Sequence, residues 1–304
     1  TRLLVPDIRL KMCYVHWIKV KELISAGMWN SISRLSQVLS DGLDLVITNI
    51  WISAYLMGEL SIAQQIPTYI STLTNTLINL FSPNLIMYYA KDDTEAVVKE
   101  LKLSMKFSSF FVNIIFCILV IFGKYFMQLW VPNQDVDLIY SLLVVIMMSL
   151  LVSGVTTSLN NVFLVTNRLK VNSIFWLIIS FTNVLLVFIF LNTTSLGIYA
   201  VAGVSKVTGI LGNLIFVPLY ACKCLKIKWN TFYPIIFRYI GTTVIMMAVF
   251  FGIRTLYVLP INWLTFFAVC VIAGIAGCIV NFFLLLNHME RDIMVNKIRA
   301  KVRK

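Results

Sequence analysis

Long apolar runs dominate the chain, and short clusters of charged residues separate them. Eight runs reach the length of about 20 residues that a helix needs to cross a hydrocarbon core of about 30 Å. They span residues 27–52, 62–89, 108–130, 138–163, 171–192, 196–219, 235–257 and 263–286. None alternates with the period of two that is typical of membrane barrel strands. The pattern predicts an all-α fold, a polytopic integral membrane helical bundle of about eight transmembrane helices.

The composition and the placement of charge agree with this prediction. Apolar residues make up 60% of the 304 residues and charged residues only 12%, against about a quarter in soluble domains. All but four of the 25 Lys and Arg residues fall in one alternating set of loops and in the two ends of the chain. The opposite loops hold only Lys124 and Arg254. The positive-inside rule therefore predicts that both termini are cytoplasmic. The net charge of +12 is then a topology signal and argues against nucleic acid as a partner.

The first run carries an unusual stripe of polar and ionisable residues. Arg34, Gln37, Asp41 and Asp44 fall on one arc about 120° wide at 100° per residue. Ionisable groups at this depth are costly, and they face a cavity or one another. Arg34 and Asp41 either pair as a structural clasp or line a water-filled pathway. The length of the stripe favours the pathway.

A second ionisable residue, Lys206, lies near the middle of the sixth run. Tyr199, Gly203 and Asn213 share its face, and such small and polar neighbours leave room for a cavity. The lysine needs an anionic partner, which is either Asp41 or Asp44 or an anionic ligand.

Two further runs carry uncharged polar faces. Ser153, Thr156, Thr157 and Asn160 align in the fourth run. The fifth run aligns four more, which are Asn172, Ser173, Ser180 and Asn183. Each face either makes hydrogen bonds between helices or completes the wall of a cavity shared with the first and sixth runs.

The chain offers little for catalysis, and we expect neither an enzyme nor a cofactor. The two histidines, His16 and His288, lie before the first run and after the last, where neither belongs to a recognisable metal-binding or nucleophilic motif, and the six cysteines show no metal-binding spacing. Asp92 and Asp93 lie in a Lys-rich helical linker, where they form either part of a solvated face or the negative charge at a helix N-terminus.

Four stretches in order resemble the polysaccharide-flippase branch of the multidrug, oligosaccharidyl-lipid and polysaccharide exporters, the Wzx-type flippases of O-antigen, capsule and teichoic-type precursors. "KELISAGMWNSISRLSQVLSDGLDLVITN" is similar to the family's seventh helix, and "SPNLIMYYAKDDTEAVVKELKLSMKF" to its eighth helix and linker. "FGKYFMQLWVP" is similar to the end of the ninth helix, and "SLGIYAVAGVSKVTGILGNLIF" to the glycine-rich twelfth.

The resemblance implies a domain organisation. Residues 1–26 look like the cytoplasmic linker between lobes, 27–219 like a six-helix second lobe, and 220–286 like two additional C-terminal helices with their linker. Residues 287–304 form a basic cytoplasmic tail. The partners implied are membrane lipids and either a missing N-terminal lobe or a separate partner lobe. The location implied is a bacterial cytoplasmic membrane.

The resemblance also implies an activity, the flipping of polyprenyl-diphosphate-linked oligosaccharide by cation-coupled alternating access, with Na⁺ or H⁺ as coupling ion. Arg34 and Lys206 would hold the diphosphate, with Gln37, Tyr199 and Asn213 in the same cavity. A further set, Asp41, Asp44, Asn183 and Thr208, would supply oxygen ligands for a coupling cation.

Two alternatives stay open at this point. One is a drug or cation antiporter of the same superfamily, whose cavity should be net acidic. The other is a non-transporting half-protein that acts as a scaffold subunit of a polysaccharide-assembly complex.

Overall fold

The computed structural model describes residues 17–256, 262–286 and 291, and within them it is helical with no strand. The long helices are α1 (Trp17–Ile47), α2 (Ala54–Asn79), α4 (Thr94–Trp130), α5 (Val136–Thr156), α7 (Leu169–Thr193), α8 (Ile198–Leu211), α10 (Tyr233–Leu256) and α11 (Trp263–Leu284). Short helices continue some of them, namely α3 (Ser82–Ala90), α6 (Asn160–Val165) and α9 (Val217–Leu225). Each predicted run falls on one of these helices or on a helix with its continuation. The all-α prediction is therefore confirmed.

Six helical segments in the described part of the chain are long and apolar enough to cross a membrane. They run from Thr94 to Trp130, Val136 to Val165, Leu169 to Thr193, Ile198 to Leu225, Tyr233 to Thr255 and Trp263 to Leu284. The first two predicted spans, on α1 and α2, are not among these six, because polar and charged residues lower their mean hydropathy. The chain is a multi-pass membrane protein.

Local sequence signals fix several helix boundaries. Ser53 is extended and caps α2 by accepting a hydrogen bond from the amide of Leu56 at 3.1 Å. Asp93 and Asp135 cap α4 and α5 in the same way, at 2.9 and 3.0 Å. Gly197 precedes α8 with a φ of 52°, a conformation that glycine adopts without steric cost.

The break after α2 differs from the single span that residues 62–89 predict. The α-helix stops at Asn79, and α3 begins at Ser82 with Pro83 in its first turn. Proline has no amide hydrogen to donate and favours this position in a helix. By contrast, the charged linker after α3 joins the next span without interruption, since α4 runs over 37 residues.

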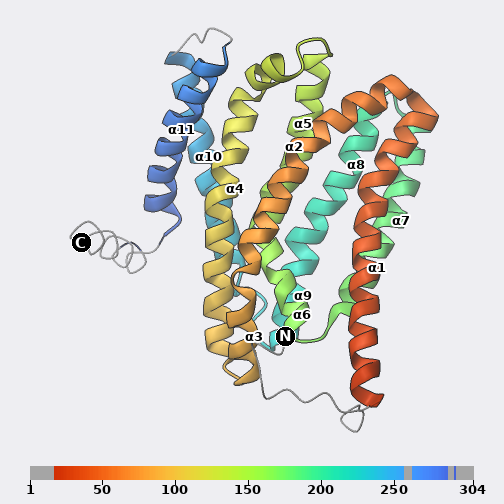
Figure 1. Ribbon diagram of the computed structural model, residues 1–304, viewed down its shortest axis with the longest axis vertical. Coiled ribbons are helices and arrows are strands. Elements are labelled where there is room, and N and C mark those ends of the chain that lie inside the picture. Colours follow the sequence, from red (N-terminus) through yellow and green to blue (C-terminus); the bar gives the residue numbers. More distant parts are fainter. Residues whose placement is uncertain (1–16, 257–261, 287–290, 292–304) are drawn as a thin grey trace, which may run out of the picture.

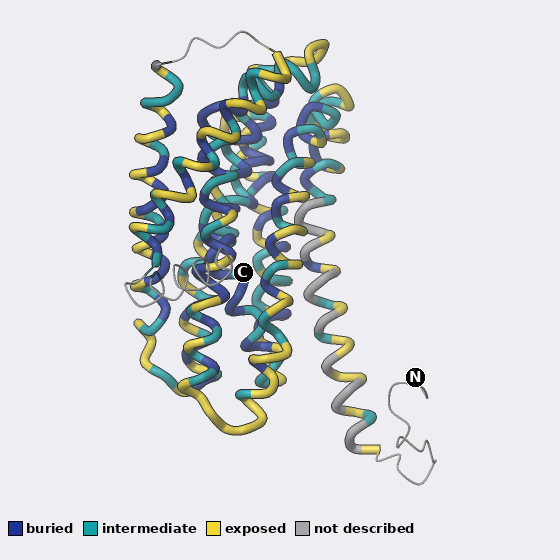
Figure 2. The backbone as a smooth tube through the Cα atoms, turned by 60° about the vertical axis from the view of Figure 1, so that its left-hand side comes forward, coloured by how far each residue is buried: buried dark blue, intermediate teal, exposed yellow. Residues whose placement is uncertain are grey.

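The helices pack in a connected series across the bundle (Figure 1). α1 lies against α7, α7 against α8, and α8 against α5. α5 packs on α4, which also contacts α10 and α11. α2 begins beside the end of α1 and crosses α5 and α4. Buried residues gather in the middle of the bundle, while α11 is mostly exposed or intermediate (Figure 2).

Candidate functional site

The polar face of α7 is buried against α1. The Ser173 hydroxyl donates to the backbone carbonyl of Trp29 at 2.8 Å, and the Ser180 hydroxyl donates to that of Ser36 at 3.1 Å. Both serines also donate to carbonyls of their own helix. These contacts favour interhelical hydrogen bonding, one of the two interpretations of this face.

A buried carboxylate joins α1 to α8. Asp44, only 4% exposed, lies one turn before the end of α1. Its Oδ2 accepts a hydrogen bond from the Ser205 hydroxyl of α8 at 2.9 Å. The Asp44 backbone carbonyl also accepts from the Thr48 hydroxyl at 2.7 Å. The residue sits where α1 changes into a π-helical segment, Thr48–Ile52, and such segments recur at functional sites.

A second polar pair lies one turn further along α8. The Thr208 hydroxyl donates to Oδ1 of Asn183, an α7 residue with 6% exposure. The same hydroxyl lies 3.1 Å from the carbonyl oxygen of Ser205. Ser205 thus connects the Asp44 contact to the Asn183 contact, and oxygens from α1, α7 and α8 form one connected set. Oxygen ligands of this kind suit a hard cation or a proton.

The structure brings together some of the predicted site residues and separates others. Asp44, Asn183 and Thr208 belong to the connected set, and half-buried Lys206 is adjacent to Ser205 on α8. The side chains of Arg34, Gln37 and Asp41 lie outside what the structure describes, and so do His16 and His288.

Tyr199 and Asn213 contact α5. The Tyr199 hydroxyl is 2.7 Å from the Ser141 hydroxyl, and Asn213 Oδ1 accepts from Thr156 at 3.3 Å. They stand 14 residues apart on α8 and its continuation, roughly 20 Å at 1.5 Å per residue. One small ligand group therefore does not touch both.

The sequence analysis missed a polar stripe on α2. All of its members are uncharged and exposed, and they are Ser61, Gln65, Thr68, Thr72, Asn75, Thr76 and Asn79. They fall on an arc about 100° wide at 3.6 residues per turn. The regular spacing of these uncharged residues was the available signal. The three threonine hydroxyls donate to carbonyls of their own helix, at 2.8, 2.9 and 2.9 Å. The amide side chains of the stripe need water or protein beside them in a membrane, so the stripe is a candidate wall of an aqueous cavity.

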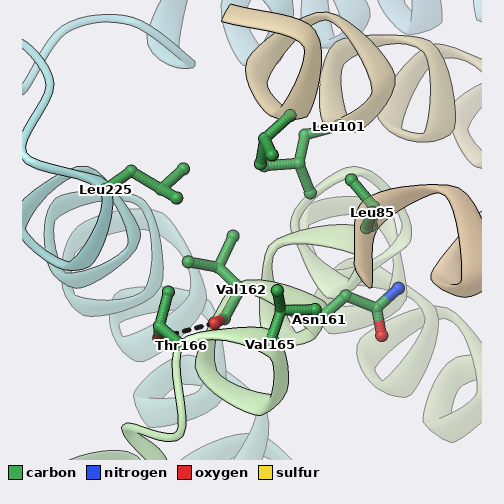
Figure 3. Close-up of a pocket in the computed structure, with 8 residues that line it drawn as sticks. Leu85, Leu101, Asn161, Val162, Val165, Thr166 and Leu225 are labelled. Atoms are coloured by element: carbon green, nitrogen blue, oxygen red, sulfur yellow. Dashed lines mark hydrogen bonds between the residues drawn. The ribbon is translucent and has the colours of Figure 1, made fainter. Parts of the chain in front are cut away.

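A small pocket lies at the end of the bundle that holds α3, α6 and α9 (Figure 3). Its empty space amounts to about 180 Å³ at most, part of it open to solvent, and its lining is Leu85, Val97, Leu101, Asn161, Val162, Val165, Thr166 and Leu225. Small-molecule sites typically start near 300 Å³. The pocket is too small and too apolar to hold a charged or sugar-bearing ligand.

Comparisons with known proteins identify relatives of this architecture. No family model matches the chain. An uncharacterized membrane protein, EpsK of Bacillus subtilis, is 24% identical over 296 residues, which are 97% of this chain and 58% of EpsK. The lipid II flippase MurJ, in its inward closed conformation, superposes with a TM-score of 0.57 at 17% identity, over 84% of this chain and 51% of MurJ.

The chain therefore spans little more than half the length of each protein it matches. Neither relative's name is that of an enzyme. The likeness to MurJ, at 17% identity, shows the fold alone, and the assignments to the exporter superfamily and to its Wzx-type branch stay predictions. The chain has a MurJ-like membrane transporter fold.

Proposed function

We propose that this chain forms half of a transporter that flips polyprenyl-diphosphate-linked oligosaccharide across a bacterial cytoplasmic membrane. The observation that carries the proposal is the connected set of buried oxygens in a fold similar to that of a lipid-linked precursor flippase. A protein that only held its helices together would have little need for a buried carboxylate at their junction, because a neutral pair does this at lower cost.

The buried oxygens serve as the coupling site. Asp44, Asn183 and Thr208, with Asp41 from the same helix as Asp44, supply ligands for Na⁺ or a proton. The site draws on α1, α7 and α8, so its occupancy controls how these helices sit relative to one another. Binding energy that differs between two conformations is what shifts their populations.

Two kinds of surface would bind the two parts of the substrate, its diphosphate and its sugars. Lys206 and Arg34 attract the diphosphate, since cations in a low-dielectric environment interact strongly with anions. Gln37 belongs to this part of the cavity, while Tyr199 and Asn213, roughly 20 Å apart along α8 and its continuation, would contact different groups of the substrate. The α2 stripe offers amides and hydroxyls without charge, and these groups match the hydroxyls of sugars.

A second lobe completes the cavity. The exposed polar stripe of α2 lies on a surface that this chain leaves open, and a facing lobe would enclose water and substrate there. The oligosaccharide would cross by rocking of the two lobes around the binding site. An N-terminal lobe or a separate partner chain supplies that second surface.

The test is export of lipid-linked oligosaccharide by the complete transporter in proteoliposomes. Lys206→Ala should abolish export, because the diphosphate loses its cation, while Lys206→Arg should retain part of it. Lys124→Ala is the matched control, since Lys124 pairs with Asp137 near the end of α4 and outside the proposed cavity.

Other outcomes decide against the proposal. Unchanged export by the Lys206→Ala variant would remove the diphosphate role. Export of an organic cation in place of the lipid-linked sugar would identify a drug antiporter. Absence of any transport, with retention in a polysaccharide-assembly complex, would identify a scaffold.

A further inference from the structure

Two arginines lie against the end of α11, at the edge of the bundle where α10 and α11 pack beside α4 (Figure 1). Arg238 of α10 donates through Nε to the carbonyl of Leu284 at 2.5 Å and through Nη2 to that of Leu286 at 3.4 Å. Arg291, which follows α11, donates to the carbonyl of Phe283 and, through Nε, to that of Leu286 at 3.1 Å. Neither the coupling site nor the substrate cavity uses these arginines.

The two guanidinium groups share one oxygen. Nη2 of Arg238 and Nε of Arg291 both lie within 3.4 Å of the Leu286 carbonyl oxygen, so two positive groups are held close together. Like charges at such a distance repel each other, and a backbone carbonyl carries only a partial negative charge. An anion with several oxygens that reaches both groups would stabilise the pair. Phosphate suits this role, because guanidinium donors match its oxygens in spacing and charge.

The sequence around Arg291 adds to the positive charge. Residues 287–304 contain six basic residues and two acidic ones, Glu290 and Asp292. Apart from Arg291, these residues lie outside what the structure describes. An excess of positive charge directly after a transmembrane helix is typical of segments that attract anionic lipids.

The arginine pair lies at the level of the membrane interface. Arg238 is in the second turn of the membrane-spanning segment of α10, and Leu284 is the last residue of that of α11. The exposed rings of Trp229 and Phe237 each lie 6.1 Å from the ring of Tyr233 between them. Such aromatic groups are enriched at the level of lipid headgroups. The distribution of Lys and Arg predicts that this end of the pair is cytoplasmic.

An apolar ridge leads from the arginine pair along α11. The Arg291 guanidinium lies 5.7 Å from the centre of the Phe283 ring. Ile275, Ile279 and Phe283 follow one another at intervals of four residues, and each is more than half exposed. The acyl chains of a lipid whose phosphate bound the arginines would cover this ridge. A free phosphate ion would make no use of it, so the surface favours a lipid.

We propose that Arg238 and Arg291 form a binding site for the phosphate of an anionic bilayer phospholipid at the cytoplasmic end of the α10–α11 pair. The phosphate oxygens accept hydrogen bonds from both guanidinium groups, and the acyl chains lie along the α11 ridge. In the series of helix contacts, α4 and α5 stand between this site and the α8 side of the Asp44 contact. The site is therefore separate from the proposed cavity, and the inference does not depend on the proposed function.

Native mass spectrometry of the complete protein tests the site, with equal amounts of phosphatidylglycerol and phosphatidylcholine added in detergent. The wild type should bind the anionic lipid in preference by about tenfold or more, since each arginine near the membrane surface adds to the attraction. The double variant Arg238→Gln with Arg291→Gln should reduce that preference to less than about twofold. Glutamine removes the charge but keeps an amide that can donate to the carbonyls of α11.

The matched control removes two positive charges from the other end of the pair and of α4. Arg254 of α10 also donates to a backbone carbonyl, that of Ile121 at 3.3 Å, and Lys124 pairs with Asp137. The double variant Lys124→Gln with Arg254→Gln should keep the wild-type preference. Equal loss in the control would mean that overall positive charge attracts the lipid, and this would overturn the proposal. Equal binding of both lipids by the wild type, or a preference that survives in the Arg238 and Arg291 variant, would also overturn it.

Two competitors identify the source of the phosphate. A large excess of inorganic phosphate at constant ionic strength should not displace phosphatidylglycerol, and displacement would show a site for free phosphate. Preference for a polyprenyl phosphate over phosphatidylglycerol would assign the site to the transported lipid. Either result would overturn the assignment to a bilayer phospholipid.

Ionic strength provides a test that needs no variant, in case the double variant fails to accumulate. The wild-type preference for phosphatidylglycerol should weaken as the salt concentration rises from about 0.05 to about 0.5 M, because salt screens exposed charges. A preference that does not change with salt would overturn the role of the arginines.

Discussion

Two buried polar contacts hold this bundle together in different ways. On one side, the Asn113 amide of α4 donates to Asn281 Oδ1 of α11 at 3.0 Å, and Asn281 donates to the carbonyl of Phe110 at 3.0 Å. On the other side, Asp44 of α1 accepts from Ser205 of α8, and Thr208 donates to Asn183 of α7. The first contact is neutral, and the second contains a carboxylate.

The packing around the two contacts differs as well. A methyl group added at Gly277 of α11 would lie 2.9 Å from Cγ1 of Ile114 on α4. Gly42 of α1 and Gly203 of α8 would meet no described atom within 4 Å. The α4–α11 contact is thus closely fitted and suits a permanent attachment. Gly42 and Gly203 are two residues from Asp44 and Ser205, so they border open space on faces turned away from the carboxylate. What sets the α1–α7–α8 contact apart is its buried carboxylate, and under the proposed function its helices move.

The largest effect is expected from removing the negative charge of Asp44, because only the contact between α1 and α8 contains a carboxylate. Asp44→Asn keeps the size of the side chain and an oxygen that can accept from Ser205, but it removes the negative charge. Opposite charges about 4 Å apart attract by roughly 4 kcal/mol at an effective dielectric constant near 20, so the apparent affinity for the coupling cation should fall by about a hundredfold or more. Export by the complete transporter, titrated with Na⁺ and with pH, measures this change.

Ser173→Ala is the control for the Asp44 variant, because it removes a hydrogen bond between α7 and α1 without changing charge. It should lower thermal stability slightly and leave the cation dependence intact. Loss of the Asp44→Asn protein from the membrane would instead make Asp44 a structural clasp.

The next effect concerns packing. Gly277→Ala should destabilise the protein by about 1–3 kcal/mol, because the new methyl group overlaps Ile114 and approaches Phe250 at 3.3 Å. Gly274→Ala, one turn earlier on the same helix, meets no described atom within 4 Å and should be neutral or stabilising by up to about 1 kcal/mol. Thermal unfolding of both variants in detergent measures the difference. Equal stability of the pair would show that α11 does not fit closely against α4.

Much of the fold could be predicted from the sequence, because the bilayer imposes a length and a polarity on each helix. The apolar runs marked the helices, and the polar face of residues 172–183 marked the buried side of α7. Contacts across the bundle could not be predicted in the same way. Asn113 and Asn281 lie 168 residues apart, and each looks like an isolated amide in an apolar run.

The α2 stripe and Glu59 were missed for a different reason. The stripe consists of uncharged residues that lower hydropathy without breaking the apolar run into recognisable pieces. Glu59 lies just outside the predicted span 62–89. Only the folded structure shows that its side chain is buried, with 1% exposure.

The smallest effect probes the neutral contact itself. Asn281→Leu leaves the buried amide of Asn113 without its acceptor and should cost about 1–2 kcal/mol of stability. The double variant Asn113→Leu with Asn281→Leu should recover part of that loss, because neither amide of the pair then stays unpaired. A double-mutant cycle by thermal unfolding in detergent should give a coupling energy near 0.6 kcal/mol, the usual size for hydrogen bonds between membrane helices. Export per folded transporter should not change in any of the three variants. If it falls with the stability, the α4–α11 contact takes part in transport, and the distinction between a fixed and a mobile contact would have to be given up.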